Sequence, residues 1–116
     1  MRHRKKKVTL DRAAGPRKAL LRNLTASVLI YEKIKTTEAK AKAVRSKVEK
    51  MITLAKRNNL SAIKALIAYL PQRTSVNKVL EVLAKRYEGR NGGYTRIIKI
   101  GPRQGDGAKI VQVELV

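Results

Sequence analysis

Residues 37–57 read TEAKAKAVRSKVEKMITLAKR, and their apolar positions recur every three or four residues. This spacing is typical of a helix with one buried face, here formed by Ala41, Val44, Val48, Met51 and Ala55. Thr37 is suited to cap the first turn, where the negative charge of Glu38 also suits the helix dipole. Asn58 and Asn59 end the pattern. The stretch therefore predicts a long amphipathic helix in the middle of the chain.

The segment before this helix predicts a first helix followed by a short strand. Pro16 suits a first helical turn, since its missing N–H has no partner there. Residues 16–30, PRKALLRNLTASVLI, and the following Tyr31 then form one apolar face with Leu21, Leu24, Val28 and Tyr31. Residues 30–37, IYEKIKTT, alternate like a strand, although they could also be the fraying end of the helix. We expect a short strand.

Two further helices are expected after Asn59. The first covers residues 62–70, is capped by Ser61 and stopped by Pro71, and turns inward Ile63, Leu66, Ile67 and Leu70. The second is capped by Thr74 or Ser75 and turns inward Val76, Val79, Leu80, Leu83 and Tyr87. Residues 89–93, which hold three glycines, then break the chain.

The C-terminal residues change to the period of β-strands. YTRIIKI (94–100) and KIVQVELV (109–116) are rich in β-branched residues and flank a glycine-rich loop, which predicts an antiparallel hairpin. The expected fold is α+β, a two-layer helix-on-sheet domain in the order α-β-α-α-α-β-β with a small mixed sheet. We expect residues 1–14 to form a basic N-terminal extension and residues 15–116 to form a single domain.

The charge of the chain points to a polyanionic partner. It has 28 Lys and Arg against 8 Asp and Glu, a formal net charge of +20, and such self-repulsion opposes compaction. The excess is +8 in residues 1–25, +6 in residues 26–57 and +3 in each of the segments 58–88 and 89–116. Nucleic acid is the simplest partner that would neutralise it.

Other classes of function find little support in the residues. After the basic start MRHRKKK, Asp11, Arg12 and Pro16 interrupt the apolar run that a signal peptide needs, and no stretch approaches the ~20 apolar residues of a membrane helix. There is no cysteine and a single histidine, His3, and the carboxylates are scattered. We therefore expect no catalytic residues, no metal site, no cofactor, no small-molecule substrate and no membrane partner.

A DNA-binding module is the rival interpretation. The two helices around Pro71 resemble a helix-turn-helix, in which Asn77, Lys78 and Glu81 would face a major groove. However, residues 74–88 carry three basic groups against two acidic ones, so that helix would be almost neutral. Core packing explains its period better.

The helix expected over residues 37–57 also has a basic face outside its apolar stripe. This face either is solvated or contacts phosphates, and it comprises Lys40, Arg45, Lys47, Lys50 and Lys56.

The two glycine-containing segments near the C-terminus could also approach phosphates. GRNGGYTR (89–96) and GPRQGDGA (101–108) supply Arg90, Arg96 and Arg103, while glycines allow close backbone approach as well as ordinary turns. Tyr94 belongs either to the core or to a base-stacking site, and we favour the core.

Several local patterns together resemble one protein family. They are MRHRK, Leu10-Asp11-Arg12, RKALLRNL (17–24), KIKTTEAKAKAVR (33–45) and NGGYTRIIKIGPRQGD (91–106), in collinear order. This set is similar to the bacterial-type large-subunit ribosomal protein seventeen family, with departures at Lys7, Val8, Thr9, Pro16 and Gln104. The resemblance implies a helix-on-sheet protein without catalytic activity. It would bind large-subunit ribosomal RNA and neighbouring large-subunit ribosomal proteins near the exit of the peptide tunnel, in the cytoplasmic ribosome of a bacterium rather than in an organelle.

The basic start is then interpreted as an RNA-binding arm, too polar to fold alone, that orders against phosphates. Alternatives are a DNA-compacting protein or a basic RNA chaperone. The candidate RNA-binding residues are Arg2, His3, Arg4, Lys5, Lys6, Lys7, Arg12, Arg17, Lys18, Arg22, Asn23, Lys35, Lys40, Arg90, Arg96 and Arg103.

Overall fold

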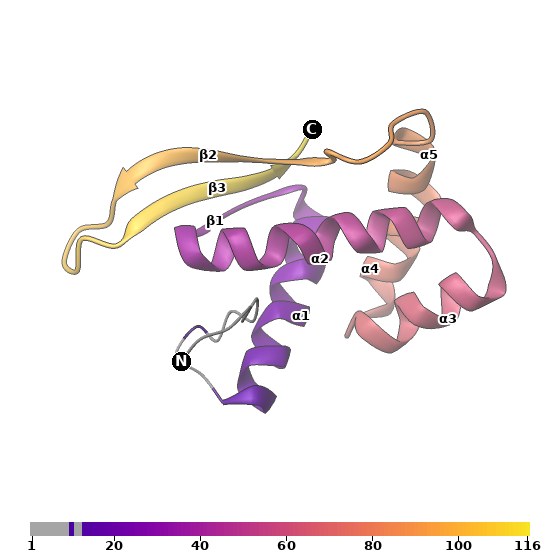
Figure 1. Ribbon diagram of the computed structural model, residues 1–116, viewed down its shortest axis with the longest axis horizontal. Coiled ribbons are helices and arrows are strands. Elements are labelled where there is room, and N and C mark those ends of the chain that lie inside the picture. Colours follow the sequence, from indigo (N-terminus) through magenta and orange to yellow (C-terminus); the bar gives the residue numbers. More distant parts are fainter. Residues whose placement is uncertain (1–9, 11–12) are drawn as a thin grey trace, which may run out of the picture.

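The computed structural model, which describes Leu10 and residues 13–116, has a layer of helices on one side of a small sheet (Figure 1). The helices are α1 (Ala14–Tyr31), α2 (Glu38–Arg57), α3 (Leu60–Tyr69), α4 (Arg73–Lys78), the π-helical turn η1 (Val79–Leu83) and α5 (Ala84–Arg86). The strands are β1 (Lys33–Thr37), β2 (Thr95–Pro102) and β3 (Lys109–Leu115). The expected α+β helix-on-sheet fold is confirmed, including the strand between the first two helices.

The sheet has β3 in its centre, with β1 and β2 on either side. Val113 of β3 is paired with Ile34 of β1 and with Ile97 of β2, and both pairings are antiparallel. The expectation of a mixed sheet is therefore wrong. β1 and β2 run in the same direction, but β3 separates them, so no parallel pair forms between the described strands.

The core lies between α2 and the inner face of the sheet. Every residue expected on the apolar stripe of α2 is buried, and Ile52 joins them. Val111 and Val113 of β3 are almost completely buried as well, in keeping with the alternation of that strand. Because α2 also contacts α1, α3 and the helical run 73–86, it is the element on which the helical layer is assembled.

The buried face of α1 is rotated from the predicted one. Tyr31 was expected inside, but 70% of it is exposed, and Thr25, Val28 and Leu29 form the buried stripe. Thr25 can enter the core because its hydroxyl donates to the carbonyl of Leu21 at 2.6 Å. Because this hydrogen bond satisfies its hydroxyl, the polar residue Thr25 occupies a core position that the spacing of apolar residues alone did not predict.

The predicted starts of α3 and α4 are also corrected. Asn59, not Ser61, caps α3, with its side chain accepting the N–H of Ala62 at 2.8 Å. The last helical run begins at Arg73 after Gln72, so neither Thr74 nor Ser75 is its cap. Ser75 is instead buried, and its hydroxyl donates to the carbonyl of Gln72 at 2.6 Å.

Ile67 of α3 is 59% exposed, although the period placed it inward. α3 packs on α2 and touches α4. These neighbours cover only a narrow face of α3, on which Ala62 and Leu66 are buried. In the run 73–86 the expected core residues Val76, Val79, Leu83 and Tyr87 are buried, and Leu80 is partly buried.

Glu32 joins the end of α1 to three other parts of the fold. Its backbone is left-handed, with φ 66°, and its N–H donates to the carbonyl of Val28 at 2.8 Å. Its carbonyl accepts the N–H of Leu115 at 2.8 Å. Its carboxylate accepts hydrogen bonds from Arg86 and, at 2.9 Å, from Lys78. The hydrogen bonds from these two cations, of which that from Arg86 has the larger effect, lower the pKa of Glu32 from 4.5 to about 2.

We expect Glu32→Gln to lower the free energy of unfolding at neutral pH by about 1 kcal/mol, since the site is partly solvent-screened, and the melting temperature by about 4 °C. A carboxylate with a lowered pKa stabilises the fold above its unfolded-state pKa, and this contribution disappears as the pH falls toward the folded-state value. The difference between wild type and variant should thus be complete above pH about 4.5 and shrink toward pH about 2. Urea titrations from pH 3 to 7 measure it.

Glu81→Gln is the matched control, because Glu81 is exposed and forms no ion pair among the described residues. A Glu32→Gln variant with an unchanged melting temperature, or a difference that grew as the pH fell, would contradict the role assigned to this junction.

Candidate nucleic-acid interface

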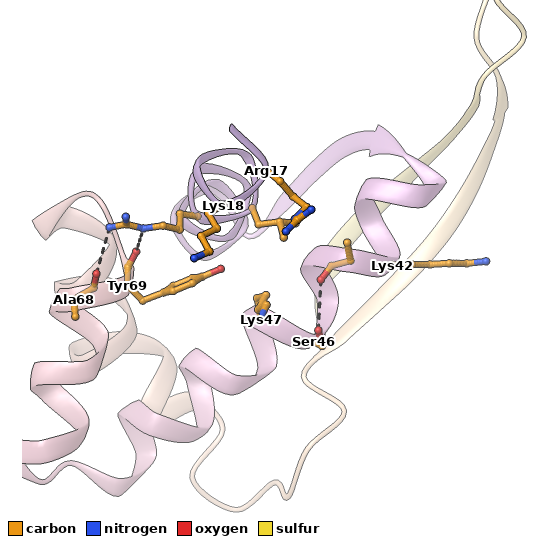
Figure 2. Close-up of a pocket in the computed structure, with 10 residues that line it drawn as sticks. Arg17, Lys18, Lys42, Ser46, Lys47, Ala68 and Tyr69 are labelled. Atoms are coloured by element: carbon orange, nitrogen blue, oxygen red, sulfur yellow. Dashed lines mark hydrogen bonds between the residues drawn. The ribbon is translucent and has the colours of Figure 1, made fainter. Parts of the chain in front are cut away.

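A hollow of about 590 Å³ lies between α1, α2 and the end of α3, and basic side chains line it. The cations are Arg17, Lys18 and Arg22 from α1 and Lys42 and Lys47 from α2. Figure 2 shows Lys18 and the ring of Tyr69 turned toward the space between the two long helices, with Lys47 opposite. Segments that are far apart in sequence thus place five positive groups around one depression.

Helical spacing explains why these side chains share one surface. Lys18 and Arg22 are four residues apart on α1, and Ala43 and Lys47 are four apart on α2, so each pair projects from the same side of its helix. The apolar floor of the hollow comes from Leu21, Ala43 and Ala68. The surface is therefore a basic rim around a small apolar depression.

Most of this positive charge has no acidic partner among the residues that the structure describes. No described carboxylate pairs with Arg17, Lys18 or Lys47. Only 8% of Arg17 is exposed, and an anionic partner stabilises a guanidinium that is enclosed to this extent. Lys42 is the exception, since its Nζ lies 3.1 Å from Glu38 Oε1 and lowers the pKa of that carboxyl. The hollow is therefore suited to bind an anion.

Arg22 has a structural role in addition to its charge. Its Nε donates to the carbonyl of Tyr69 at 2.5 Å, and one terminal nitrogen donates to the carbonyl of Ala68 at 3.3 Å. These carbonyls belong to the last turn of α3, which has no further helical turn to bond them. Arg22 thus caps α3 from α1 and fixes one wall of the hollow, and the dashed lines at Ala68 and Tyr69 in Figure 2 mark the two bonds.

The remaining α1, α2 and β1 candidates lie outside the hollow. Asn23 is exposed on α1, Lys35 is exposed on β1, and Lys40 is half-buried in the first turn of α2. None of the three lines it.

Two of the three candidates near the C-terminus are paired with carboxylates of the protein. Arg96 pairs with Glu114 across the sheet, and Arg103 pairs with Asp106 in the loop between β2 and β3. The partner lowers the pKa of each carboxyl, that of Asp106 to about 2. The carbonyl of Arg90 accepts hydrogen bonds from Lys56 and from the hydroxyl of Tyr94. Arg96 and Arg103 are thus less free to meet a phosphate than the cations of the hollow. Arg90 is not restrained in this way, because its backbone carbonyl and not its guanidinium is bonded.

Tyr94 lies in the core, as favoured from the sequence. It is 2% exposed, its ring packs against that of Tyr87 at a centroid distance of 5.1 Å, and Lys56 donates to its hydroxyl at 3.0 Å. A second set of predicted contacts lies outside the described residues: Arg2, His3, Arg4, Lys5, Lys6, Lys7 and Arg12.

Sequence reasoning missed two cations and one ring of the hollow as site residues. Lys47 was placed on a basic face of α2 that either is solvated or contacts phosphates, but it was not among the candidate binding residues, and Lys42 and Tyr69 were not singled out. No local pattern marks them, because they become neighbours of Arg17 and Lys18 only through the packing of α1 and α3 on α2.

Comparison with known proteins identifies the family. Residues 20–116 match the family model described as ribosomal protein L17. The chain belongs to the ribosomal protein L17 family. It is 52% identical over 107 residues to the large ribosomal subunit protein bL17 of Clostridium botulinum (strain Hall), which covers 92% of this chain and 95% of that protein. The bL17 proteins of Caldanaerobacter subterraneus subsp. tengcongensis and Thermoanaerobacter sp. (strain X514) are 52% and 51% identical over 92% of the chain and 96% of their own lengths.

Membership of the L17 family confirms that the chain is a structural, non-enzymatic ribosomal component. The geometry also agrees with the interpretation of residues 73–86 as a core helix rather than a DNA-reading one. Lys78 does not face outward as that alternative requires, since its Nζ bonds Glu32 at 2.9 Å and the carbonyl of Ile30 at 3.4 Å.

In the part of the chain that the structure describes, no helix is long and apolar enough to cross a membrane. No cluster of three or more metal-ligating side chains is present among the same residues.

We expect Arg22→Ala to destabilise the free protein by about 1.5–3 kcal/mol, the range for hydrogen bonds to charged groups, because the carbonyls at the end of α3 lose their donor. Lys18→Ala and Lys47→Ala, which remove cations of the same hollow without recorded hydrogen bonds among the described residues, should leave the melting temperature nearly unchanged. Thermal denaturation without nucleic acid measures all three, and equal effects would contradict the capping role.

Proposed function

We propose that this protein is a structural constituent of the large ribosomal subunit that binds large-subunit ribosomal RNA and thereby supports translation. The observation that carries the proposal is the hollow between α1 and α2, whose cations Arg17, Lys18 and Lys47 lack acidic partners among the described residues. Family membership supplies the context, since relatives about half identical to this chain are named large ribosomal subunit proteins. The proposed location is the cytoplasmic ribosome of a bacterium, near the exit of the peptide tunnel and beside other large-subunit proteins.

The positive charge is proposed to act in two parts. Residues 1–14 form a basic extension that lies along phosphates, and residues 15–116 form a folded domain that presents fixed cations. An extension pays roughly 1–2 kcal/mol of backbone entropy for each residue that it orders on binding. Cations on α1 and α2 avoid this cost because the helices already hold them. The fixed cations should therefore select the shape of the RNA, while the extension mainly adds affinity.

Competition and co-sedimentation test the proposal. Purified large-subunit ribosomal RNA should displace a labelled RNA fragment from the protein far more effectively than duplex DNA of equal length does. The protein should also remain with intact large subunits through a high-salt wash. Equal competition by duplex DNA would favour the DNA-binding alternative, and loss from the subunits in the wash would favour an RNA chaperone.

Binding should depend steeply on salt, because each neutralised phosphate releases counterions. If about 6–10 phosphates are contacted, the affinity should fall by roughly 10³–10⁵ between 50 and 200 mM monovalent salt. Filter binding or fluorescence anisotropy over this range gives the slope. A nearly flat dependence would exclude phosphate contacts as the main source of affinity.

Deletion of residues 2–12, which carry six basic side chains, should leave the melting temperature of the free protein nearly unchanged or slightly higher, because it relieves repulsion. RNA binding should weaken and its salt slope should flatten, while the preference for ribosomal RNA over duplex DNA remains. The matched variant is Arg17→Ala/Lys18→Ala/Lys47→Ala, which should reduce that preference more for each charge removed. Unfolding of the truncated protein would show that residues 2–12 belong to the core, and an unchanged affinity and salt slope would show that they only solubilise the protein.

A further inference from the structure

Tyr69 stands apart from the other three tyrosines of the chain. The rings of Tyr87 and Tyr94 pack against each other at a tilt of 53° in the core, and their hydroxyls donate to carbonyl groups. Tyr31 is 70% exposed and lines none of the described hollows. The ring of Tyr69 is partly buried, lies in the wall of the basic hollow, and has no hydrogen bond to its hydroxyl from any described residue (Figure 2). It is thus an aromatic surface held among cations.

The shape of the hollow differs from that of a plain phosphate-binding surface. Contact with a regular RNA backbone requires only an outward-facing row of cations. Here the cations surround a depression of about 590 Å³ with an apolar floor, within the range of about 300–1,000 Å³ that holds small ligands. An aromatic ring, an apolar floor and a cationic rim are together the features that bind a base and its phosphate.

The ring is also held in position. Arg22 bonds the carbonyl of Tyr69 itself, and its guanidinium carbon lies 6.0 Å from the centre of the ring. Because Arg22 extends from α1, the last turn of α3 cannot move away from α1 without breaking these bonds. A preformed stacking surface loses little freedom when a base settles on it. Arg22 is therefore a positioning residue for Tyr69.

We propose that this hollow binds one unpaired nucleotide of the RNA, whose base stacks on Tyr69 and whose phosphate is held by Arg17, Lys18 and Lys47. The inference rests on the proposed RNA-binding function and names the feature that the folded domain selects. In a continuous duplex the bases are stacked inside and cannot reach the ring without being extruded. The free-energy cost of unstacking the base is lower for a bulged or looped-out nucleotide.

The test uses the full-length protein and two RNA hairpins of the same stem, one fully paired and one with a single bulged 2-aminopurine. The bulged hairpin should bind more tightly, by roughly 5- to 150-fold, the gain from one base–aromatic stack, and its fluorescence should be quenched on binding. Tyr69→Leu should remove the preference and the quenching but leave the affinity for the paired hairpin and its salt slope unchanged. Tyr69→Phe should keep both, and Tyr31→Leu is the control at an exposed tyrosine outside the hollow.

A second readout needs no variant. With 5-iodouridine as the bulged nucleotide, irradiation should cross-link the RNA to the tryptic peptide of residues 65–73, which contains Tyr69. Equal binding of both hairpins by the wild type, or a cross-link confined to another peptide, would overturn the inference and leave the proposed RNA binding intact. Failure to bind either hairpin, or equal displacement by duplex DNA, would instead count against the proposed function.

Discussion

Twenty uncompensated positive charges oppose the compaction of a chain of 116 residues, so the fold depends on where its few carboxylates are placed. Three of those with recorded partners, Glu32, Glu49 and Glu114, lie at joints between elements. Glu32 ties the end of α1 to Lys78 and Arg86, and Glu49 of α2 accepts hydrogen bonds from both the backbone and the hydroxyl of Thr95 at the start of β2. Glu114 pairs with Arg96 across the sheet. Each of these carboxylates offsets local repulsion and at the same time holds two segments together.

This use of the acidic groups divides the surface of the protein. On the sheet and its connecting loop, Arg96 and Arg103 already have carboxylate partners. Between α1 and α2, Arg17, Lys18 and Lys47 have none among the described residues, so their field remains available to an external anion. Among the described residues, unpaired positive charge is therefore gathered around the hollow between α1 and α2, which the total charge alone does not reveal.

The sequence predicted those features of the fold that depend on local periodicity. The stripe of α2, the alternation of β3 and the helix-on-sheet class were correct because a buried face repeats regularly along each element. Tyr31 and Ile67 were misplaced because the period does not reveal how far neighbouring elements cover a helix. The candidate site was predicted only in part for a similar reason. Arg17, Lys18 and Arg22 are close in sequence, whereas Lys47 and Tyr69 join them only through the packing of three helices.

Arg22 shows that folding and binding cannot be assigned to separate residues in this domain. From the sequence it is one more cation on α1, yet its guanidinium is bonded to carbonyls at the end of α3. Those bonds reduce its freedom to bind a phosphate, but they set the distance between α1 and α3 and hence the position of Tyr69. The packing that completes the helical layer therefore also forms the hollow, and a variant of Arg22 would alter stability and RNA selection together. Lys18 and Lys47, which the fold does not use in this way, can report on binding alone.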